Sequence, residues 1–302
     1  MSIRQRARTR LHRLALLGAS VAALCPTHAW AAEELNGKDK GSVSARTDLF
    51  LNQLTFFERS YFIAGGRADQ AKFQLSLKYN LWPNTTPHAV YVGYTQTSFW
   101  DIYEWSGPFT EFNFTPVLFY EYRIPRPQPQ RSAEYCGPSF VRWALDHSSN
   151  GLVGTASRAF NRLSSTIATG CYSATGALFE TRLQLWPPLI FDGENEDMEA
   201  YIGYGELTFN WASARSARGY GQVELSARFR KGASEDLRRG AVYLEAAWNP
   251  NYGAPVEGIW RFTPYLFAQF FTGYAESLST YDIMHTRWRI GFGLNDILAE
   301  KH

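Results

Sequence analysis

The amino-acid sequence predicts an all-β fold, an antiparallel transmembrane β-barrel of twelve strands. No apolar run reaches the length of about 20 residues that a transmembrane helix needs. Segments of about 10 residues instead alternate between apolar and polar side chains, as strands do when one face meets lipid and the other the lumen. The apolar faces are rich in Phe, Tyr and Trp, and the polar faces carry charges of both signs. Aromatic girdles and a packed polar lumen have these compositions.

The alternation separates the two faces residue by residue. In residues 71–82 the apolar face holds Phe73, Leu75, Leu77 and Tyr79, and the polar face holds Lys72, Gln74, Ser76 and Lys78. Residues 111–124, 221–231 and 283–295 divide in the same way. A soluble β-sandwich would also alternate, because half of its side chains face water. The charges in mid-strand and the aromatic apolar faces favour the barrel.

The N-terminus has the features of a secretory signal peptide over residues 1–31. Five arginines precede an apolar run over residues 14–25, and Ala29-Trp30-Ala31 is a small-x-small cleavage pattern. An uncleaved anchor is the alternative, but the apolar run is too short to cross a bilayer stably. Cleavage would remove five of the 30 basic residues and none of the 28 acidic ones, which leaves a net charge of −3. The mature chain then has no basic excess that would indicate nucleic-acid binding.

The rest of the chain predicts one domain. Residues 32–56 read as a polar lead-in and residues 57–298 as the barrel. Eleven strands are expected near residues 71–82, 88–101, 111–124, 137–149, 157–170, 174–186, 198–212, 221–231, 239–248, 264–277 and 283–295. The weak run over residues 60–66 supplies a twelfth strand, because single-chain bacterial barrels have an even number. Both termini then fall on the same side. The alternation gives the weakest support to the assignment of residues 249–261.

The stretch with the most reactive side chains begins at "HSSNG". Alternation over residues 137–149 places His147 and Ser149 on the apolar face. In the next strand the same rule places Asn161 on that face, nearly opposite His147 across a short loop. Polar groups facing lipid cost free energy unless they pair. Ser149, His147 and Asn161 are therefore candidates for a nucleophile, its base and an orienting group.

Other interpretations of this stretch stay open. Asp146 and Ser148 are adjacent in sequence but should face the lumen. A His and a Ser at a strand end often have no catalytic role. The barrel could then be a passive outer membrane channel or a structural barrel, although bulky charged residues on the lumen faces argue against a wide pore.

"HSSNG", with "FNR" ten residues further on, resembles the outer membrane phospholipase A family. That family carries His-Asp-Ser-Asn-Gly and then Ser-Arg-x-x-Asn-Arg at the same interval. "KFQLSL", "YTQTSFW", "SGPFTEFNFTP", "TGYAESL" and "GLNDIL" are similar to family segments in the same order, over most of residues 70–298. The resemblance implies a twelve-stranded outer membrane barrel that hydrolyses acyl esters of membrane glycerophospholipids and lysophospholipids. It also implies that Ca²⁺ is required, that the active form is a homodimer, and that the active site faces the outer leaflet.

Carried over to this chain, the resemblance assigns Ser149 as the nucleophile of an acyl-enzyme, His147 as the base and Asn161 as the orienting amide. The oxyanion would bind a backbone N–H near Gly151. The implied calcium ligands are the Leu152 carbonyl, the Ser157 hydroxyl and Ser106 of the partner subunit. The barrel does not end in an aromatic residue. Two further departures are Ser148 in place of the family Asp, which removes a charge, and Leu152 in place of Arg, which leaves a backbone ligand unchanged.

Gln96 is the candidate residue for the dimer interface. The even-numbered face of residues 88–101 is Val90, Val92, Tyr94, Gln96, Ser98 and Trp100, so that Gln96 is an amide among mainly apolar neighbours. Across a two-fold axis Gln96 could bind its symmetry mate, and the resemblance points to the same residue. The alternative is a register slip that turns Gln96 toward the lumen.

Two cysteines remain after removal of the signal peptide. Cys136 and Cys171 fall near each other along the hairpin that carries His147 and Asn161. Strict alternation places them on opposite faces, which predicts two free thiols. A bulge at Pro138 would re-aim Cys136 and allow a disulfide.

Overall fold

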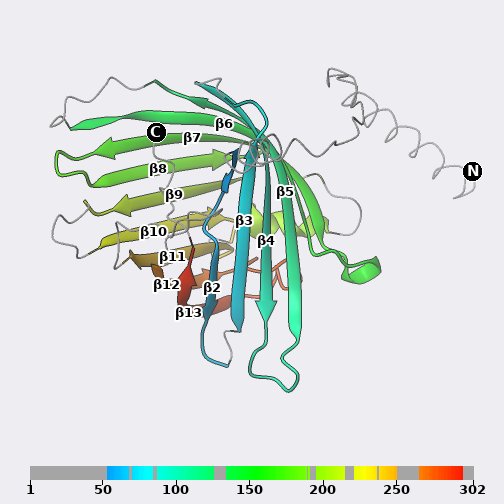
Figure 1. Ribbon diagram of the computed structural model, residues 1–302. Coiled ribbons are helices and arrows are strands. Elements are labelled where there is room, and N and C mark those ends of the chain that lie inside the picture. The colour runs from blue at the N-terminus through cyan, green and yellow to red at the C-terminus, as the bar shows by residue number, and fades with distance from the viewer. Residues whose placement is uncertain are drawn as a thin grey trace, which may run out of the picture. The chain divides into compact units, whose positions relative to one another are not determined.

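The computed structural model describes residues 53–67, 70–83, 87–125, 134–188, 190, 195–214, 221–236, 238–249 and 265–294. They form a closed antiparallel β-barrel, as predicted (Figure 1). Its strands are β1 (Leu54–Phe56), β2 (Tyr61–Ala64), β3 (Ala71–Asn80), β4 (His88–Trp100), β5 (Phe109–Arg123), β6 (Tyr135–Ser149), β7 (Ala159–Tyr172), β8 (Leu178–Leu185), β9 (Gly205–Ala212), β10 (Gln222–Lys231), β11 (Gly240–Asn249), β12 (Tyr265–Gly273) and β13 (His285–Gly293). From β2 onward each strand pairs with the next, and β13 pairs with β2 to close the barrel.

Strands β1 and β2 are two pieces of the first barrel strand, because both pair with β3. Leu54 lies opposite Tyr79, and Tyr61 lies opposite Gln74. Counted together they give the predicted twelve strands. Strand β2 lies in the weak run over residues 60–66 that supplied the twelfth strand.

One predicted boundary near the chain start differs from the structure, and two predicted segments lie outside the described part of the chain. Strand β1 occupies the end of the predicted lead-in over residues 32–56, so a barrel strand lies before residue 57, where the barrel was expected to begin. The predicted signal peptide over residues 1–31 and nearly all of residues 249–261 lie outside the residues that the structure describes.

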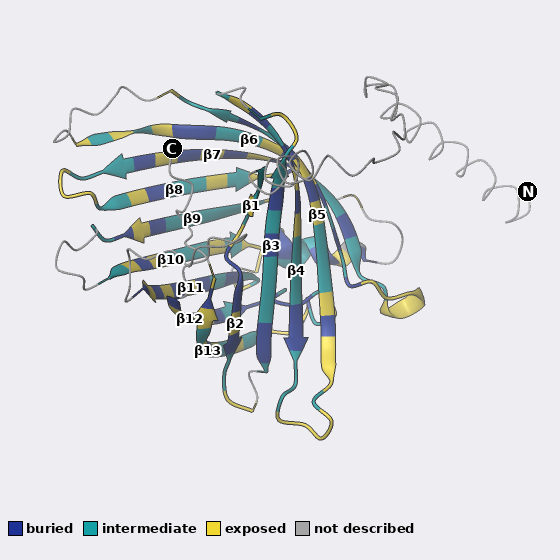
Figure 2. Cartoon of the chain, in the orientation of Figure 1, coloured by how far each residue is buried: buried dark blue, intermediate teal, exposed yellow. Residues whose placement is uncertain are grey.

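Burial changes from residue to residue along each strand, as alternation requires (Figure 2). On β6, Trp143 and Leu145 are exposed on the outer face, whereas Arg142 and Asp146 line an interior cavity of about 1060 Å³. Polar and charged side chains supply much of that lining. Arg142 pairs with Glu121 of β5 at 2.5 Å, which compensates two charges inside the barrel.

The predicted strand over residues 198–212 is wrong in its first part. A short turn η3 (Glu196–Met198) and helix α3 (Glu199–Ile202) lie there, and β9 begins only at Gly205. Met198 and Ile202 are four residues apart, a spacing that places both on one side of a helix. They are buried in a cluster with Phe160, Trp186 and Tyr281, which gives the segment a reason to be helical. Within the described residues no helix is long and apolar enough to cross a membrane.

The predicted strand over residues 264–277 ends early, because β12 stops at Gly273. Gly273 has a φ of 131° and lies against the backbone of Gly240, where a Cβ would be 2.2 Å from the Gly240 carbonyl oxygen. Residues 274–284 therefore form a loop instead of continuing the strand.

Cys136 and Cys171 form a disulfide, so the prediction of two free thiols is wrong. The two residues are direct partners in the β6–β7 register. That register shifts between Pro138 and Phe140, which makes Ser139 an extra residue in β6. An extra residue reverses the faces of the residues on one side of it. Cys136 therefore points to the same side as Cys171.

Candidate active site on the outer wall

The β6–β7 hairpin brings His147 and Asn161 directly opposite each other on the outer face. His147 Nδ1 lies 2.9 Å from Asn161 Oδ1. An amide oxygen only accepts, so in this pairing Nδ1 carries the proton and donates it. The other ring nitrogen, Nε2, is then the basic one. The hydrogen bond fixes both the tautomer and the ring orientation.

Ser149 lies two residues beyond His147 on the same strand and points to the same face. Two residues of extended strand span about 6.8 Å, within reach of two side chains that lean toward each other. Ser149 is half-buried and lies opposite Ala159 of β7 and Phe114 of β5. The hydroxyl is therefore at the loop end of the hairpin, beside an aromatic residue.

Asp146 and Ser148 are on the other side of the barrel wall. Asp146 accepts hydrogen bonds from Arg162 Nε at 3.0 and 3.1 Å, one to each carboxylate oxygen. Ser148 Oγ is 3.2 Å from Thr115 Oγ1. Asp146, Ser148 and Arg162 all line the interior cavity, so neither Asp146 nor Ser148 shares the face of His147.

Asn161 is also held through its backbone. Its N–H donates to the Ile190 carbonyl at 2.8 Å, and the Ile190 N–H donates back to Asn161 at 3.0 Å. This isolated pairing continues the sheet beyond the end of β8. The amide that orients His147 is thus fixed from both neighbouring segments.

Gly151 follows the candidate nucleophile in a conformation that favours glycine. Its φ is 68°, and an added Cβ would lie 2.9 Å from Phe114 Cε2. Glycine satisfies both constraints, the left-handed backbone and the contact with the ring. The backbone N–H groups of this turn follow Ser149 directly in the chain, where a nucleophilic serine would need an oxyanion donor.

Asn150 organises the loop over residues 150–158, a role that its spacing in the sequence did not indicate. Its Oδ1 accepts the N–H of Leu152 at 3.2 Å and of Arg158 at 3.0 Å. Its Nδ2 donates to the Ala156 carbonyl at 2.9 Å. Asn150 is buried, so these bonds are shielded from water. The turn η2 (Gly154–Ala156) closes with the Ser157 N–H donating to Gly154 at 3.0 Å.

Gln96 lies on β4, and Ser106 lies in the loop between β4 and β5. Ser106 is exposed in the β4–β5 loop and has a φ of 73°, which is uncommon for a residue with a side chain. Gln96 lies opposite Leu75 of β3 and Phe114 of β5, whose side chains point outward. Gln96 bonds along its own strand: its Oε1 accepts the Tyr94 hydroxyl at 3.1 Å, and its Nε2 donates to the Ser98 hydroxyl at 3.2 Å.

The candidate calcium ligands are neutral oxygens. In the described part of the chain, no three His, Cys, Asp or Glu side chains gather to hold a metal ion. The Leu152 carbonyl and the Ser157 hydroxyl instead belong to one loop closed by Asn150. Carbonyl and hydroxyl oxygens suit Ca²⁺, which takes six to eight oxygen ligands. Two donors from one chain fit calcium only as part of a larger shell, completed by water or by a second chain.

The site lies inside a region that matches a known family. Residues 53–295 match the family model of phospholipase A1. The chain belongs to the phospholipase A1 family. It is 30% identical over 248 residues to phospholipase A1 of Salmonella typhimurium (strain LT2) and of Escherichia coli (strain K12), and each alignment covers 76% of this chain and 71% of the relative. Phospholipase A1 of Klebsiella pneumoniae is 28% identical over 254 residues, or 79% of this chain and 75% of the relative.

Solved structures share the fold of this phospholipase. Outer membrane phospholipase A from Escherichia coli superimposes with a TM-score of 0.63 and 22% identity, over 88% of this chain and 96% of that chain. A Salmonella typhi outer membrane phospholipase dimer with bound calcium gives a TM-score of 0.63 and 24% identity, over 81% and 93%. The family and the β-barrel fold both agree with what the sequence predicted.

Proposed function

We propose that Ser149, His147 and Asn161 form a triad that hydrolyses acyl ester bonds of glycerophospholipids and lysophospholipids through an acyl-enzyme. The observation that carries the proposal is the 2.9 Å hydrogen bond between His147 Nδ1 and Asn161 Oδ1 on the outer wall. This bond leaves Nε2 as the basic nitrogen of His147, which lies two residues before Ser149. The barrel end that carries this hairpin would face the outer leaflet, so the substrate is the lipid next to the wall.

His147 Nε2 would take the proton of Ser149 as its oxygen attacks the ester carbonyl. The proton then passes to the leaving alcohol oxygen, which departs as lysophospholipid, or as the glycerophospho-alcohol when the substrate is a lysophospholipid. Water, deprotonated by the same nitrogen, attacks the acyl-enzyme, and the bond between the acyl carbon and Ser149 Oγ breaks. His147 returns the proton to Ser149 Oγ as the fatty acid leaves. Asn161 would hold the ring in place throughout these steps but carries no charge to offset that of the imidazolium.

The negative charge of the tetrahedral intermediate would therefore need other partners. The N–H near Gly151 is one donor, fixed by the left-handed turn. Calcium, held by the Leu152 carbonyl and the Ser157 hydroxyl, would supply positive charge to the developing oxyanion. The neutral donor set from one chain leaves room for Ser106 of the partner subunit.

We infer that the active form is a homodimer joined along β4. The triad on a single barrel has no second wall to bind an acyl chain. A second barrel against this face would supply that wall, bring Ser106 to the calcium site and place Gln96 beside its symmetry mate. One solved neighbour of the same fold is a dimer with bound calcium, which supports the proposal.

Hydrolysis of a defined phospholipid in detergent micelles tests the proposed function. The purified protein should release fatty acid with calcium, lose the activity when a chelator is added, and regain it when calcium is restored. Hydrolysis that persists with the chelator would refute the calcium requirement. Ion conductance without hydrolysis under any of these conditions would favour the passive channel.

A further inference from the structure

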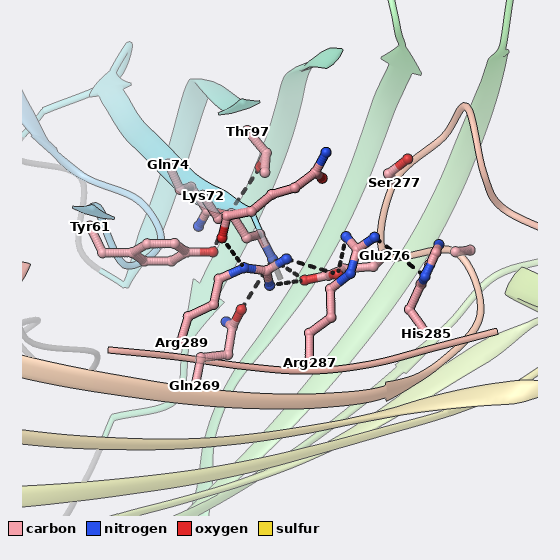
Figure 3. A network of polar contacts seen from close by, with 12 residues as sticks. Tyr61, Lys72, Gln74, Thr97, Gln269, Glu276, Ser277, His285, Arg287 and Arg289 are labelled. Carbon is pink, nitrogen blue, oxygen red and sulfur yellow. Dashed lines mark hydrogen bonds and ion pairs between the residues drawn. The ribbon is translucent and has the colours of Figure 1, made fainter. Parts of the chain in front are cut away.

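The β12–β13 loop, residues 274–284, is anchored inside the barrel mouth by Glu276. Its buried carboxylate pairs with Lys72 of β3 at 3.3 Å and with Arg287 and Arg289 of β13 at 3.2 and 2.6 Å (Figure 3). Burial alone would raise the pKa of Glu276, but the charges of Lys72 and Arg289 hold it at about 2. Glu276 therefore stays ionised at neutral pH and ties the loop to the barrel wall.

Glu111 of β5 holds the next three residues of the loop from another side of the barrel. Its carboxylate accepts a hydrogen bond from the Ser277 hydroxyl and from the N–H groups of Leu278 at 2.8 Å and Ser279 at 2.9 Å. Glu111 is 8% exposed, so these charge-assisted bonds are shielded from water. The backbone of residues 277–279 is fixed as a result.

Ser279 connects this loop to the active-site hairpin. Its Oγ accepts a hydrogen bond from Asn150 Nδ2 at 3.3 Å. Asn150 is the side chain that binds the N–H groups of Leu152 and Arg158 and so closes the loop over residues 150–158. A continuous chain of contacts thus runs from the lumen, through Glu111 and Ser279, to the turn next to Ser149.

We propose that the β12–β13 loop positions the oxyanion and calcium groups of the phospholipase, with Ser279 and Glu111 as positioning residues that act through Asn150. The proposal rests on the proposed function, because the groups it positions are the Gly151 N–H, the Leu152 carbonyl and the Ser157 hydroxyl. These groups lie in a surface loop, where backbone is ordinarily mobile. A rigid support from inside the barrel would keep them near the geometry that a calcium ion and an oxyanion require.

A purely stabilising role for these contacts makes a different prediction. If they only strengthen the barrel, losing them should lower unfolding stability and leave calcium binding to the folded protein unchanged. If they position the loop, the folded protein should bind calcium more weakly, and the N–H groups that Asn150 engages should exchange with solvent faster.

The experiment compares Ser279→Ala and Glu111→Ala with the unaltered protein. Calcium binding is measured by equilibrium dialysis of the folded barrel, and hydrogen exchange by mass spectrometry of the peptide over residues 150–158. Ser279→Ala should weaken calcium binding about fivefold, since it removes one hydrogen bond. Glu111→Ala removes the acceptor of three hydrogen bonds and should weaken calcium binding at least tenfold. Both should speed exchange of the peptide, and Ser279→Thr, which keeps the hydroxyl, should restore both values.

Glu180→Ala is the matched control. Glu180 is also 8% exposed in the lumen but binds Arg182 and Asn210, away from the loop. The proposal is overturned if the folded Ser279→Ala and Glu111→Ala proteins bind calcium and exchange like the unaltered one, or if Glu180→Ala shifts both readouts equally. No hydrolysis by the unaltered protein with saturating calcium would instead refute the proposed function. Calcium binding and exchange can still be compared in that case.

Discussion

Two neighbouring residue pairs of the β6–β7 hairpin lie on opposite faces of the barrel and interact in different ways. Asp146 faces Arg162 in the lumen and forms an ion pair, whereas one step along the strand His147 faces Asn161 on the outer wall and forms a neutral hydrogen bond. A carboxylate in the lumen has polar neighbours and a cation, but on the outer wall it would be stripped of water by lipid. An amide can orient a histidine there at a lower desolvation cost, which accounts for the difference.

The largest effect on the difference between the two faces is expected at Ser149, the proposed nucleophile. Ser149→Ala removes the hydroxyl from the outer face and should lower the hydrolysis rate by about 10⁴-fold or more, as loss of a triad serine does. Ser148→Ala is the control, because Ser148 points into the lumen toward Thr115 and should keep most of the rate. Initial rates of fatty-acid release measure both variants. Equal losses would mean that the two faces are not chemically separate at this strand end.

Gly151→Ala changes the turn after Ser149, the proposed nucleophile. The new Cβ would be strained by the φ of 68° and would press on Phe114 at 2.9 Å, so the backbone N–H should move. The turnover number should fall by about 10²-fold, the scale of losing one oxyanion donor. Gly154→Ala is the comparison, since Gly154 also has a positive φ but nothing lies within 4 Å of its added Cβ. A similar loss in Gly154→Ala would assign the effect to loop strain instead of the oxyanion donor.

The faces of the barrel could be predicted from the sequence because strand alternation is a local property. Ser149 and Ser148 differ by only one position, and that position decides which of them shares the face of His147. The same rule gave the wrong face for Cys136. Ser139 adds one residue to β6, and the alternation of apolar and polar residues does not reveal this extra residue. A proline at position 138 was the one available sign of the bulge.

Other features depend on contacts between residues far apart in the chain. The helix α3 formed in place of the start of a predicted strand because Met198 and Ile202 meet partners from three other segments. Asn150 and Ser279 are 129 residues apart, so no spacing rule connects them. The contact between the β12–β13 loop and the candidate site could therefore be found only from the three-dimensional fold. The shared face of Ser149, His147 and Asn161 could be predicted from the two-residue period of a strand.

The disulfide allows a comparison of the two ends of the same hairpin. Cys136 and Cys171 join β6 and β7 at the end away from the loop over residues 150–158, and so away from Ser149. Replacing both cysteines by serine should lower the free energy of unfolding by about 2 kcal/mol, the low end for a disulfide, because the hairpin stays paired. The rate of hydrolysis should be unchanged at a temperature where the barrel is folded. Urea titration and initial rates test this, and a large loss of rate without unfolding would show that the far end of the hairpin controls the site.

The smallest effect is expected at Gln96, a polar residue on the mainly apolar outer face. In one barrel Gln96 already bonds to Tyr94 and Ser98, so a bond to its symmetry mate in a dimer would replace contacts that exist. The net gain is therefore at most about 1 kcal/mol, typical of interhelical polar contacts in membranes. Gln96→Ala should raise the concentration for calcium-promoted dimerisation about fivefold and lower activity in proportion, with the barrel intact. Thr97→Val is the control, because Thr97 bonds to Gln74 and lines the lumen. Cross-linking in detergent with and without calcium follows the dimer, and full activity from a species that stays monomeric at saturating calcium would exclude the proposed interface.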